Sequence, residues 1–395
     1  MTTAGSRTRH RRAAFTATLL KRLDRAGAID LGTLNMSEFA FHPWGANRLR
    51  PPPANPWDAR RFAGASSGGS AAAIAGRLVF GSLGSDSGGS IRCPAAFSGI
   101  VGLLPTPGLL SRYGMALTSP TLDQPGPMAR SVRDIARLLN VLAGRDPADP
   151  ATRRRPVADY ERGLGRGLRR LRVAFAPETL ATIDPALRPV LARALDTLRS
   201  AGVRIVEIPL PSVFTAAHAD AGTVFLFEAA RTHARVLSRH ADELHPEIRA
   251  RIERGRAIPR GHYRDALARR AATAAAFADH VFRRAPAFLL PAAPIVAPTL
   301  AALAGPDPAL AAADPGRFTR AFNYLGLPAL AVPAGLTADG LPVGLQLIGP
   351  PFAEATLLRI GAAFERANPL PALPLQAQGE GVSHFFPSLS EAGGG

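Results

Sequence analysis

Lysine is almost absent from this chain of 395 residues, since Lys21 is the only one among its 47 basic residues. Cysteine occurs once, as Cys93, which excludes an intramolecular disulfide and argues against a cysteine-based metal site. A lone thiol also fits a reducing, cytoplasmic compartment. No apolar run reaches the roughly 18–20 residues that a membrane-spanning helix needs, so we expect no membrane span.

Acidic residues are also scarce, and the formal net charge is +17. Such a charge can mark a protein that binds a polyanion such as nucleic acid. The arginines, however, are dispersed along the chain rather than gathered in one stripe. Heavy use of arginine, alanine, glycine and proline instead indicates the compositional bias of a GC-rich genome. We therefore do not expect nucleic acid among the partners.

With 47% apolar and 19% charged residues, the chain can bury a large core. A strand at 172–175, a helix at 184–201 and a strand at 203–210 form a βαβ pattern, which implies parallel pairing. The sequence predicts a single α/β domain, with a central mixed sheet covered by helices, over residues 1–375, and a mobile tail over 376–395. Further expected elements are a helix at 13–26, helices throughout 213–284 broken near Pro259, and strands at 78–80, 100–104, 288–290, 329–333 and 342–348.

Two loops rich in glycine and serine, 64–70 and 84–92, carry the candidate chemistry. Glycine lets several backbone N–H groups point into one space, which can create an anion nest or an oxyanion hole. A serine in such a loop can act as a nucleophile if a base reaches it. A single loop of this kind is most often a plain turn, but two of them flanking one helix and one strand favour a site.

Three other interpretations of these loops fail. A phosphate-binding loop needs a Gly-Lys pair, which this chain lacks. Residues 64–68 match the G-x-S-x-G elbow, but the elbow should follow a strand, and 57–62 is polar and predicts a loop. Residues 86–89 are similar to the nucleophile loop of chymotrypsin-like proteases. Those enzymes are all-β, whereas this chain is rich in helical patterns.

Residues 64–74 and 84–103 together resemble the amidase signature family of serine hydrolases. The second run begins Gly84-Ser85-Asp86-Ser87 and continues through Ser90-Ile91-Arg92. The resemblance extends in order from residue 2 to about residue 370. It includes the segments 34–40, 55–58, 111–114, 122–127, 323–329 and 340–349. It implies one twisted sheet of many strands.

The resemblance also implies a Ser–Ser–Lys triad. Ser90 matches the nucleophile, and Ser66, 24 positions earlier, matches the bridging serine on a cis peptide bond. The backbone N–H groups of Ser87, Gly88 and Gly89, with that of Ser90, match the oxyanion hole. We expect the Ser66 and Ser90 hydroxyls to lie within about 2.6–3.2 Å of each other, or somewhat farther apart without substrate. No cofactor and no metal are expected, because serine, base and oxyanion hole suffice for acyl transfer.

The family's lysine lies shortly before a segment that resembles residues 2–6, so this chain is expected to begin too late to contain it. Lys21 sits between Leu20 and Arg22 in the expected first helix and does not replace it. We therefore expect residues 1–395 alone to have little amidase activity and reduced stability, either as a truncated gene product or as an inactive homologue.

Three functions stay open at this point. The first is an amidase, a hydrolase of carbon–nitrogen bonds other than peptide bonds, which cleaves a small-molecule carboxylic amide through an acyl-enzyme on Ser90. The second is a catalytically inactive homologue. The third is an amidotransferase A-type subunit that acts on aminoacyl-tRNA with a partner. The sequence names neither the substrate nor the assembly state, for which a homodimer is one expectation.

Overall fold

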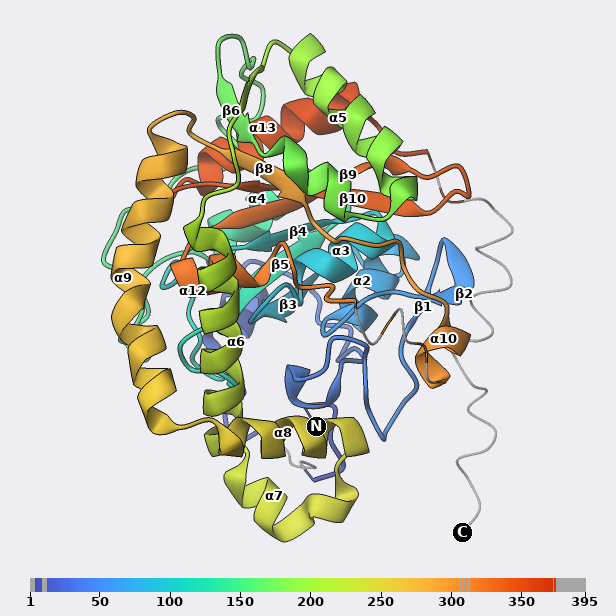
Figure 1. The fold of residues 1–395 in the computed structure, drawn as a ribbon, viewed down its shortest axis with the longest axis vertical. Helices are drawn as coiled ribbons and strands as arrows, with labels where there is room; N and C mark the ends of the chain where they lie inside the picture. The colour runs from blue at the N-terminus through green and yellow to red at the C-terminus, as the bar shows by residue number, and fades with distance from the viewer. Residues whose placement is uncertain are drawn as a thin grey trace.

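The structure is a computed structural model that describes residues 4–8, 13–305, 307, 310, 313–371 and 373. Its centre is an eight-stranded sheet, viewed among its helices in Figure 1. The strand order is β3 (Gly81–Asp86), β5 (Gln124–Ala129), β4 (Val101–Leu104), β9 (Ala329–Leu336), β10 (Pro342–Ile348), β8 (Phe288–Pro291), β6 (Arg172–Phe175) and β7 (Arg204–Glu207). The expected tail at 376–395 lies outside the described residues.

The sheet is mixed, as predicted. Strands β3 to β8 pair antiparallel in sheet order, whereas β8, β6 and β7 pair parallel. The predicted βαβ unit is confirmed, because α5 (Arg188–Ser200) connects β6 to β7 and Val173 lies opposite Ile205. Strand β10 is buried along its whole length, which explains its almost continuous apolar sequence.

Helices cover both faces of the sheet, and β9 shows the division residue by residue. Ala331 belongs to the core cluster beside α2 (Gly68–Ala75) and α3 (Arg92–Ser98). Its neighbours Leu330 and Val332 belong to the larger core, which includes α4 (Val132–Leu142) and α13 (Glu354–Ala367). This alternation follows from the two-residue period of a strand.

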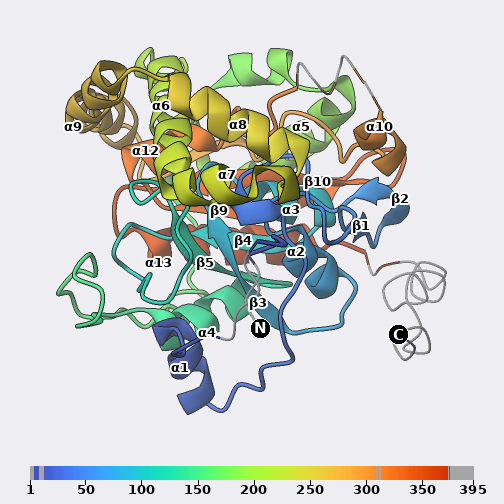
Figure 2. The ribbon, with the colours of Figure 1, turned by 90° about the horizontal axis from the view of Figure 1, so that it is seen from below.

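The helical region predicted at 213–284 is confirmed. It consists of α6 (Val213–Thr232), α7 (Ala234–His240), α8 (Pro246–Ala257) and α9 (Arg260–Phe282), with a short 3₁₀ turn η4 (Ala241–Glu243). The predicted break lies at Pro259, which caps α9 from outside the helix. Figure 2 shows α6, α7 and α8 grouped on one side of the sheet. Helix α12 (Arg320–Leu325) packs against α6 and joins this region to the sheet.

The strands near the serine loops differ from the sequence prediction in three places. The strand expected at 78–80 begins instead at Gly81, since Phe80 is 86% exposed, and it includes residues 84–86 of the expected loop. Strand β5 was missed because Pro125 and Pro127 argue against a strand, yet it lies between β3 and β4. Residues Asp58–Phe62 form β2, which pairs with β1 (Ala54–Asn55), so a strand does precede the first serine loop.

The remaining elements are short. The helix expected at 13–26 covers α1 (Thr18–Arg25) only. The others are α10 (Leu300–Ala304) and the 3₁₀ turns η1 (Glu38–Ala40), η2 (Pro177–Thr182) and η3 (Pro185–Leu187). Within the described part of the chain, no helix is both long enough and apolar enough to span a membrane.

Candidate active site

The fold brings the two serine loops into direct contact. The first loop connects β2 to α2, and the second connects β3 to α3. The Ser67 N–H donates to the Ser90 carbonyl at 3.1 Å, and the Ser67 hydroxyl accepts from the Ser85 N–H at 3.2 Å. Ser66 and Ser90 are too far apart in the sequence to belong to one turn. These contacts nevertheless place them on adjoining backbone segments.

Ser66 follows a cis peptide bond from Ala65, as predicted. Its side chain is 1% exposed, and its hydroxyl has no hydrogen-bond partner among the described residues. The direct hydrogen bond expected between Ser66 and Ser90 is therefore not formed in this structure. Lys21, the only lysine of the sequence, is exposed on α1. A buried hydroxyl without a partner is rare enough to require an explanation.

Asp86 organises the loop that carries Ser90. Its carboxylate accepts from the Gly89 N–H at 2.7 Å and from the Ile91 N–H at 3.2 Å, and it is paired with Arg92 at 3.0 Å. The Gly89 N–H is thus engaged by Asp86 inside the loop, and its oxyanion-hole role stays a prediction. The N–H groups of Ser87, Gly88 and Ser90 make no hydrogen bond within the described chain, and their role stays a prediction.

Arg92 is fully buried and links this loop to α12 and β10. Its guanidinium donates to the side-chain oxygens of Asn323 at 2.7 Å and Gln346 at 3.1 Å. Burial alone would raise the pKa of Asp86, but the Arg92 charge and the hydrogen bonds from Asn323 and Gly89 hold it below its usual value. In the sequence, these residues were recognised only as part of the family pattern, and no role was predicted for them. The signal that would have found them is the presence of charged and amide side chains in otherwise apolar segments.

The other side of the loop is held by the segment before α12. The Thr319 hydroxyl donates to the Gly88 carbonyl at 2.6 Å. Gly89 has a φ of 129°, and a Cβ built there would lie 2.2 Å from the Thr319 hydroxyl oxygen. The Arg320 side chain packs over Gly88, with its Cγ 3.2 Å from a Cβ built at that glycine. Glycine is therefore required at Gly89 by both conformation and space.

A buried polar network lies beneath Ser87. The Ser87 hydroxyl donates to Asp123, which also accepts from the Thr118 N–H at 2.6 Å and the Ser119 N–H at 3.0 Å. Burial raises the pKa of Asp123 above its usual value. The Ser119 hydroxyl continues the network to Glu228 on α6 at 2.6 Å. Ser87 is thus committed to a structural hydrogen bond, whereas Ser90 is half-buried.

Cys93 does not compete with Ser90 as the nucleophile. Cys93 is buried, and burial raises the pKa of its thiol to about 12, so the reactive thiolate is not populated at neutral pH. Among the described residues, no group of three or more histidine, cysteine, aspartate and glutamate side chains is placed to hold a metal ion.

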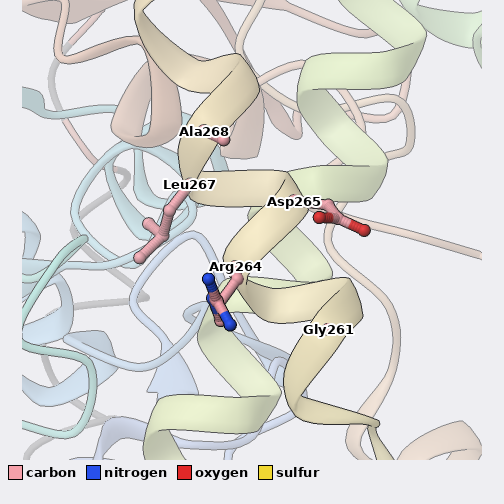
Figure 3. Close-up of a pocket in the computed structure, with 5 residues that line it drawn as sticks. All are labelled: Gly261, Arg264, Asp265, Leu267 and Ala268. Atoms are coloured by element: carbon pink, nitrogen blue, oxygen red, sulfur yellow. The ribbon is translucent and has the colours of Figure 1, made fainter.

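Two hollows lie outside the serine loops. Figure 3 shows the first, of about 630 Å³, whose lining comes from α9 alone: Gly261, Arg264, Asp265, Leu267 and Ala268. A hollow on one helix holds no converging groups and is remote in sequence from both serine loops. The second, of about 540 Å³, is lined partly by Asp314, Arg317 and Phe318, which lead into Thr319. Only this second hollow adjoins the segment that contacts the Ser90 loop.

Comparison with known proteins gives a consistent match. The family model described as Amidase matches residues 1–358. The A subunit of the glutamyl-tRNA(Gln) amidotransferase of Anaeromyxobacter sp. (strain K) is 41% identical over 385 residues, which cover 91% of this chain and 78% of that protein. Because the family match begins at residue 1, it does not confirm the prediction that a segment with the lysine is missing.

Two solved structures are similar to this chain in both fold and sequence. The crystal structure of the A subunit of glutamyl-tRNA(Gln) amidotransferase from Thermotoga maritima has a TM-score of 0.83 and 32% identity, and the match covers 94% of this chain and 82% of that one. A crystal structure described as an amidase has a TM-score of 0.79 and 31% identity, with 92% and 80% coverage.

Proposed function

This chain belongs to the Amidase family, and we propose that it cleaves a carboxylic amide through an acyl-enzyme formed on Ser90. The observation that supports the proposal most is the pairing of the two serine loops, in which Ser67 donates to the Ser90 carbonyl. Ser67 directly follows Ser66, whose buried hydroxyl has no hydrogen-bond partner among the described residues. Ser90 itself is half-buried, so a substrate can reach it, and its backbone is held by the hydrogen bond from Ser67.

In the proposed reaction the Ser90 oxygen attacks the amide carbonyl. The Ser90 proton passes to Ser66, and Ser66 passes its own proton on to the nitrogen of the leaving amine. The leaving amine takes up a proton as the carbon–nitrogen bond breaks, and water then hydrolyses the ester on Ser90 to a carboxylic acid. The backbone N–H groups of Ser87, Gly88 and Ser90 are the donors available to the oxyanion, and each such donor contributes a rate factor of about 10²–10³. Lys21 is exposed on α1 and is not proposed as the base.

We further propose that the amide is cleaved on behalf of an amidotransferase. The supporting observation is the 41% identity to the A subunit of a glutamyl-tRNA(Gln) amidotransferase over nine-tenths of this chain. In that role the ammonia released at Ser90 would be used by a partner protein that acts on aminoacyl-tRNA. A free-standing amidase is the second candidate, favoured by the TM-score of 0.79 to a solved amidase.

The test of the acyl-enzyme is ammonia release from a panel of carboxamides by the purified chain. Ser90→Ala should abolish release, and Ser238→Ala, an exposed serine on α7, should leave it unchanged. Mass spectrometry after rapid quenching should find the acyl group on the peptide that contains Ser90. Release by Ser90→Ala at the parent rate would refute the proposal, and a parent chain that neither acylates nor releases ammonia would favour the non-catalytic homologue.

The two candidate roles differ in their partners. A component of an amidotransferase should co-purify with a second protein and support amide formation on glutamyl-tRNA only in its presence. A free-standing amidase should purify alone and reach full turnover without any addition. Full turnover alone, with no gain from a partner, would contradict the amidotransferase role and leave the Ser90 chemistry intact.

A further inference from the structure

Exposed arginines are concentrated in the segment that leads into β6. Residues 153–172 contain eight arginines and only two acidic residues. All eight arginines are exposed, and none of their side chains makes an ion pair or a hydrogen bond with the described residues. Arginines occur throughout the chain, but this segment carries a local excess of positive charge that it does not neutralise itself.

The fold places the last three of these arginines beside one from β7. Arg172 begins β6 and lies directly opposite Arg204, the first residue of β7. Neighbouring strands are about 4.7–4.9 Å apart, so these two side chains leave one face of the sheet side by side. The turn of Arg169 and Arg170 packs against the turn before β7, since a Cβ built at Gly202 would lie 3.4 Å from Arg169 Cα. We call Arg169, Arg170, Arg172 and Arg204 the arginine patch.

The arginine patch is remote from the serine loops. Strand β6 lies beside α5 and α13 at one end of the molecule, whereas α7 and α8 lie at the other end (Figure 1). The second serine loop follows β3, which is the opposite edge of the sheet from β7. Helix α13 adds one more cation at the border of the patch, because the Arg359 guanidinium donates to the Gly167 carbonyl.

Three carboxylates near the arginine patch in the sequence are committed to other arginines. Glu161 pairs with Arg137 at 3.1 Å. Asp196 and Glu207 both pair with Arg199, at 2.8 and 3.7 Å. Within the described part of the chain, no carboxylate comes within ion-pair distance of a patch guanidinium. The patch therefore has no counter-charge inside this chain.

This arrangement favours an external anion. Like charges directly opposite each other destabilise a sheet, so the facing of Arg172 and Arg204 is a cost that a bound anion would relieve. Neither of the two hollows described above includes a patch residue, so the patch does not enclose a small anion. A polymer with many phosphates can instead contact several exposed guanidinium groups at once and release its counterions.

An acidic protein fits the patch less well than a nucleic acid does. The centres of protein interfaces are enriched in apolar and aromatic side chains and depleted of charge. None of the large apolar side chains that are exposed in the described chain lies between residues 160 and 210. The surface thus offers charge without an apolar centre, as expected for contacts to a phosphate backbone.

We propose that the arginine patch binds the phosphodiester backbone of a nucleic acid without reading its bases. Guanidinium groups match phosphate oxygens in paired hydrogen bonds, and such contacts position a nucleic acid but carry no sequence information. Nucleic acid was not expected from the sequence, because the arginines are dispersed along the chain. The pairing of β6 with β7 gathers four of them. This inference goes beyond the proposed function and does not involve Ser90.

Binding is measured by fluorescence anisotropy with a labelled tRNA mixture and a labelled short DNA duplex, between about 50 and 200 mM salt. The parent chain should bind both with similar affinity, with a Kd of roughly 10⁻⁶ M at the lower salt. The triple variant Arg169→Gln, Arg172→Gln, Arg204→Gln should bind at least about tenfold more weakly. Its log–log dependence of affinity on salt should be shallower by about 2–3, since each lost phosphate contact removes about 1 from the slope.

The matched control removes the same number of charges from the other end of the molecule. Arg235 and Arg239 on α7 and Arg256 on α8 are exposed. The triple variant Arg235→Gln, Arg239→Gln, Arg256→Gln should keep its affinity within about threefold of the parent, because it leaves the phosphate contacts in place. Thermal melting checks both folds, and at low salt the patch variant should melt no lower than the parent, since it removes the repulsion between Arg172 and Arg204.

The inference is overturned if neither nucleic acid binds the parent at the lower salt, or if the two triple variants lose affinity equally, which would show an effect of net charge alone. It is also overturned if poly-glutamate competes as well as tRNA at equal charge, which would assign the patch to an acidic protein. Ser90→Ala should bind tRNA as the parent does, and the patch variant should release ammonia at the parent rate. Failure of this inference would therefore leave the proposed function intact.

Discussion

Asp86 and Arg92 form an ion pair, with 3.0 Å between the Arg92 terminal nitrogen and the carboxylate oxygen, in which neither side chain is exposed to solvent. The pair lies inside the loop that presents Ser90, and the same carboxylate accepts the Gly89 and Ile91 N–H groups. A buried pair of this kind contributes little net free energy against a well-packed apolar pair, but removal of one partner leaves an uncompensated charge. The Ser90 loop should therefore depend on both residues.

Arg92→Met should destabilise the protein by about 3–5 kcal/mol, because Asp86 would stay buried without its partner. Urea denaturation followed by circular dichroism measures the change. The matched control is Arg199→Met, which breaks the exposed ion pair with Asp196 and should cost less than about 1 kcal/mol. Equal losses in the two variants would contradict the assigned difference in burial.

The stability contributed by Asp86 should depend on pH. Its pKa in the folded protein lies below the ordinary value of 3.8. A depressed carboxyl pKa stabilises the fold at pH values above 3.8, and this contribution is lost as the pH falls through the folded-state pKa. The difference in unfolding free energy between the parent and Asp86→Asn should therefore shrink below pH 3.8. A difference that grows on acidification would show that the assigned sign is wrong.

Gly89→Ala should cost both stability and activity, because a Cβ would meet the Thr319 hydroxyl at 2.2 Å and the φ of 129° disfavours any side chain. We expect a loss of more than about 2 kcal/mol, as for strain combined with overpacking, and a fall in amide turnover of at least about a hundredfold. Gly340→Ala separates the strain of a positive φ from the steric overlap of the new Cβ. Gly340 also has a positive φ, of 76°, but no atom lies within 4 Å of its built Cβ. This control should lose only about 1 kcal/mol and keep full turnover.

Ser66→Ala should separate catalysis from stability. The Ser66 hydroxyl is buried without a hydrogen-bond partner among the described residues, so its removal breaks no native bond and should change the unfolding free energy by less than about 1 kcal/mol. Amide turnover should nevertheless fall by about 10²–10⁴, the range for loss of a proton-transfer group. Parallel measurement of urea denaturation and ammonia release checks both. A large loss of stability with retained turnover would assign Ser66 a structural role instead.

Local sequence predicted the parts of the fold that local interactions determine. The strand–helix–strand unit from β6 to β7 follows from apolar periodicity, and the break between α8 and α9 follows from Pro259. Strand β5 escaped prediction because Pro125 and Pro127 lower strand propensity, and only its place between β3 and β4 explains why it forms. Strand β2 is short and polar, and it was mistaken for a loop because its pairing with β1 has no strong local signal.

By itself, the sequence determined that two glycine-rich loops would carry Ser66 and Ser90, because the need for glycine in such turns is a property of each residue's own backbone. Only the tertiary structure decided which side chains meet around them. Arg92 reaches Gln346 across 254 positions, and Gly89 directs its N–H to Asp86. Such contacts depend on strand order and helix packing over long sequence separations, which residue-by-residue propensities do not encode.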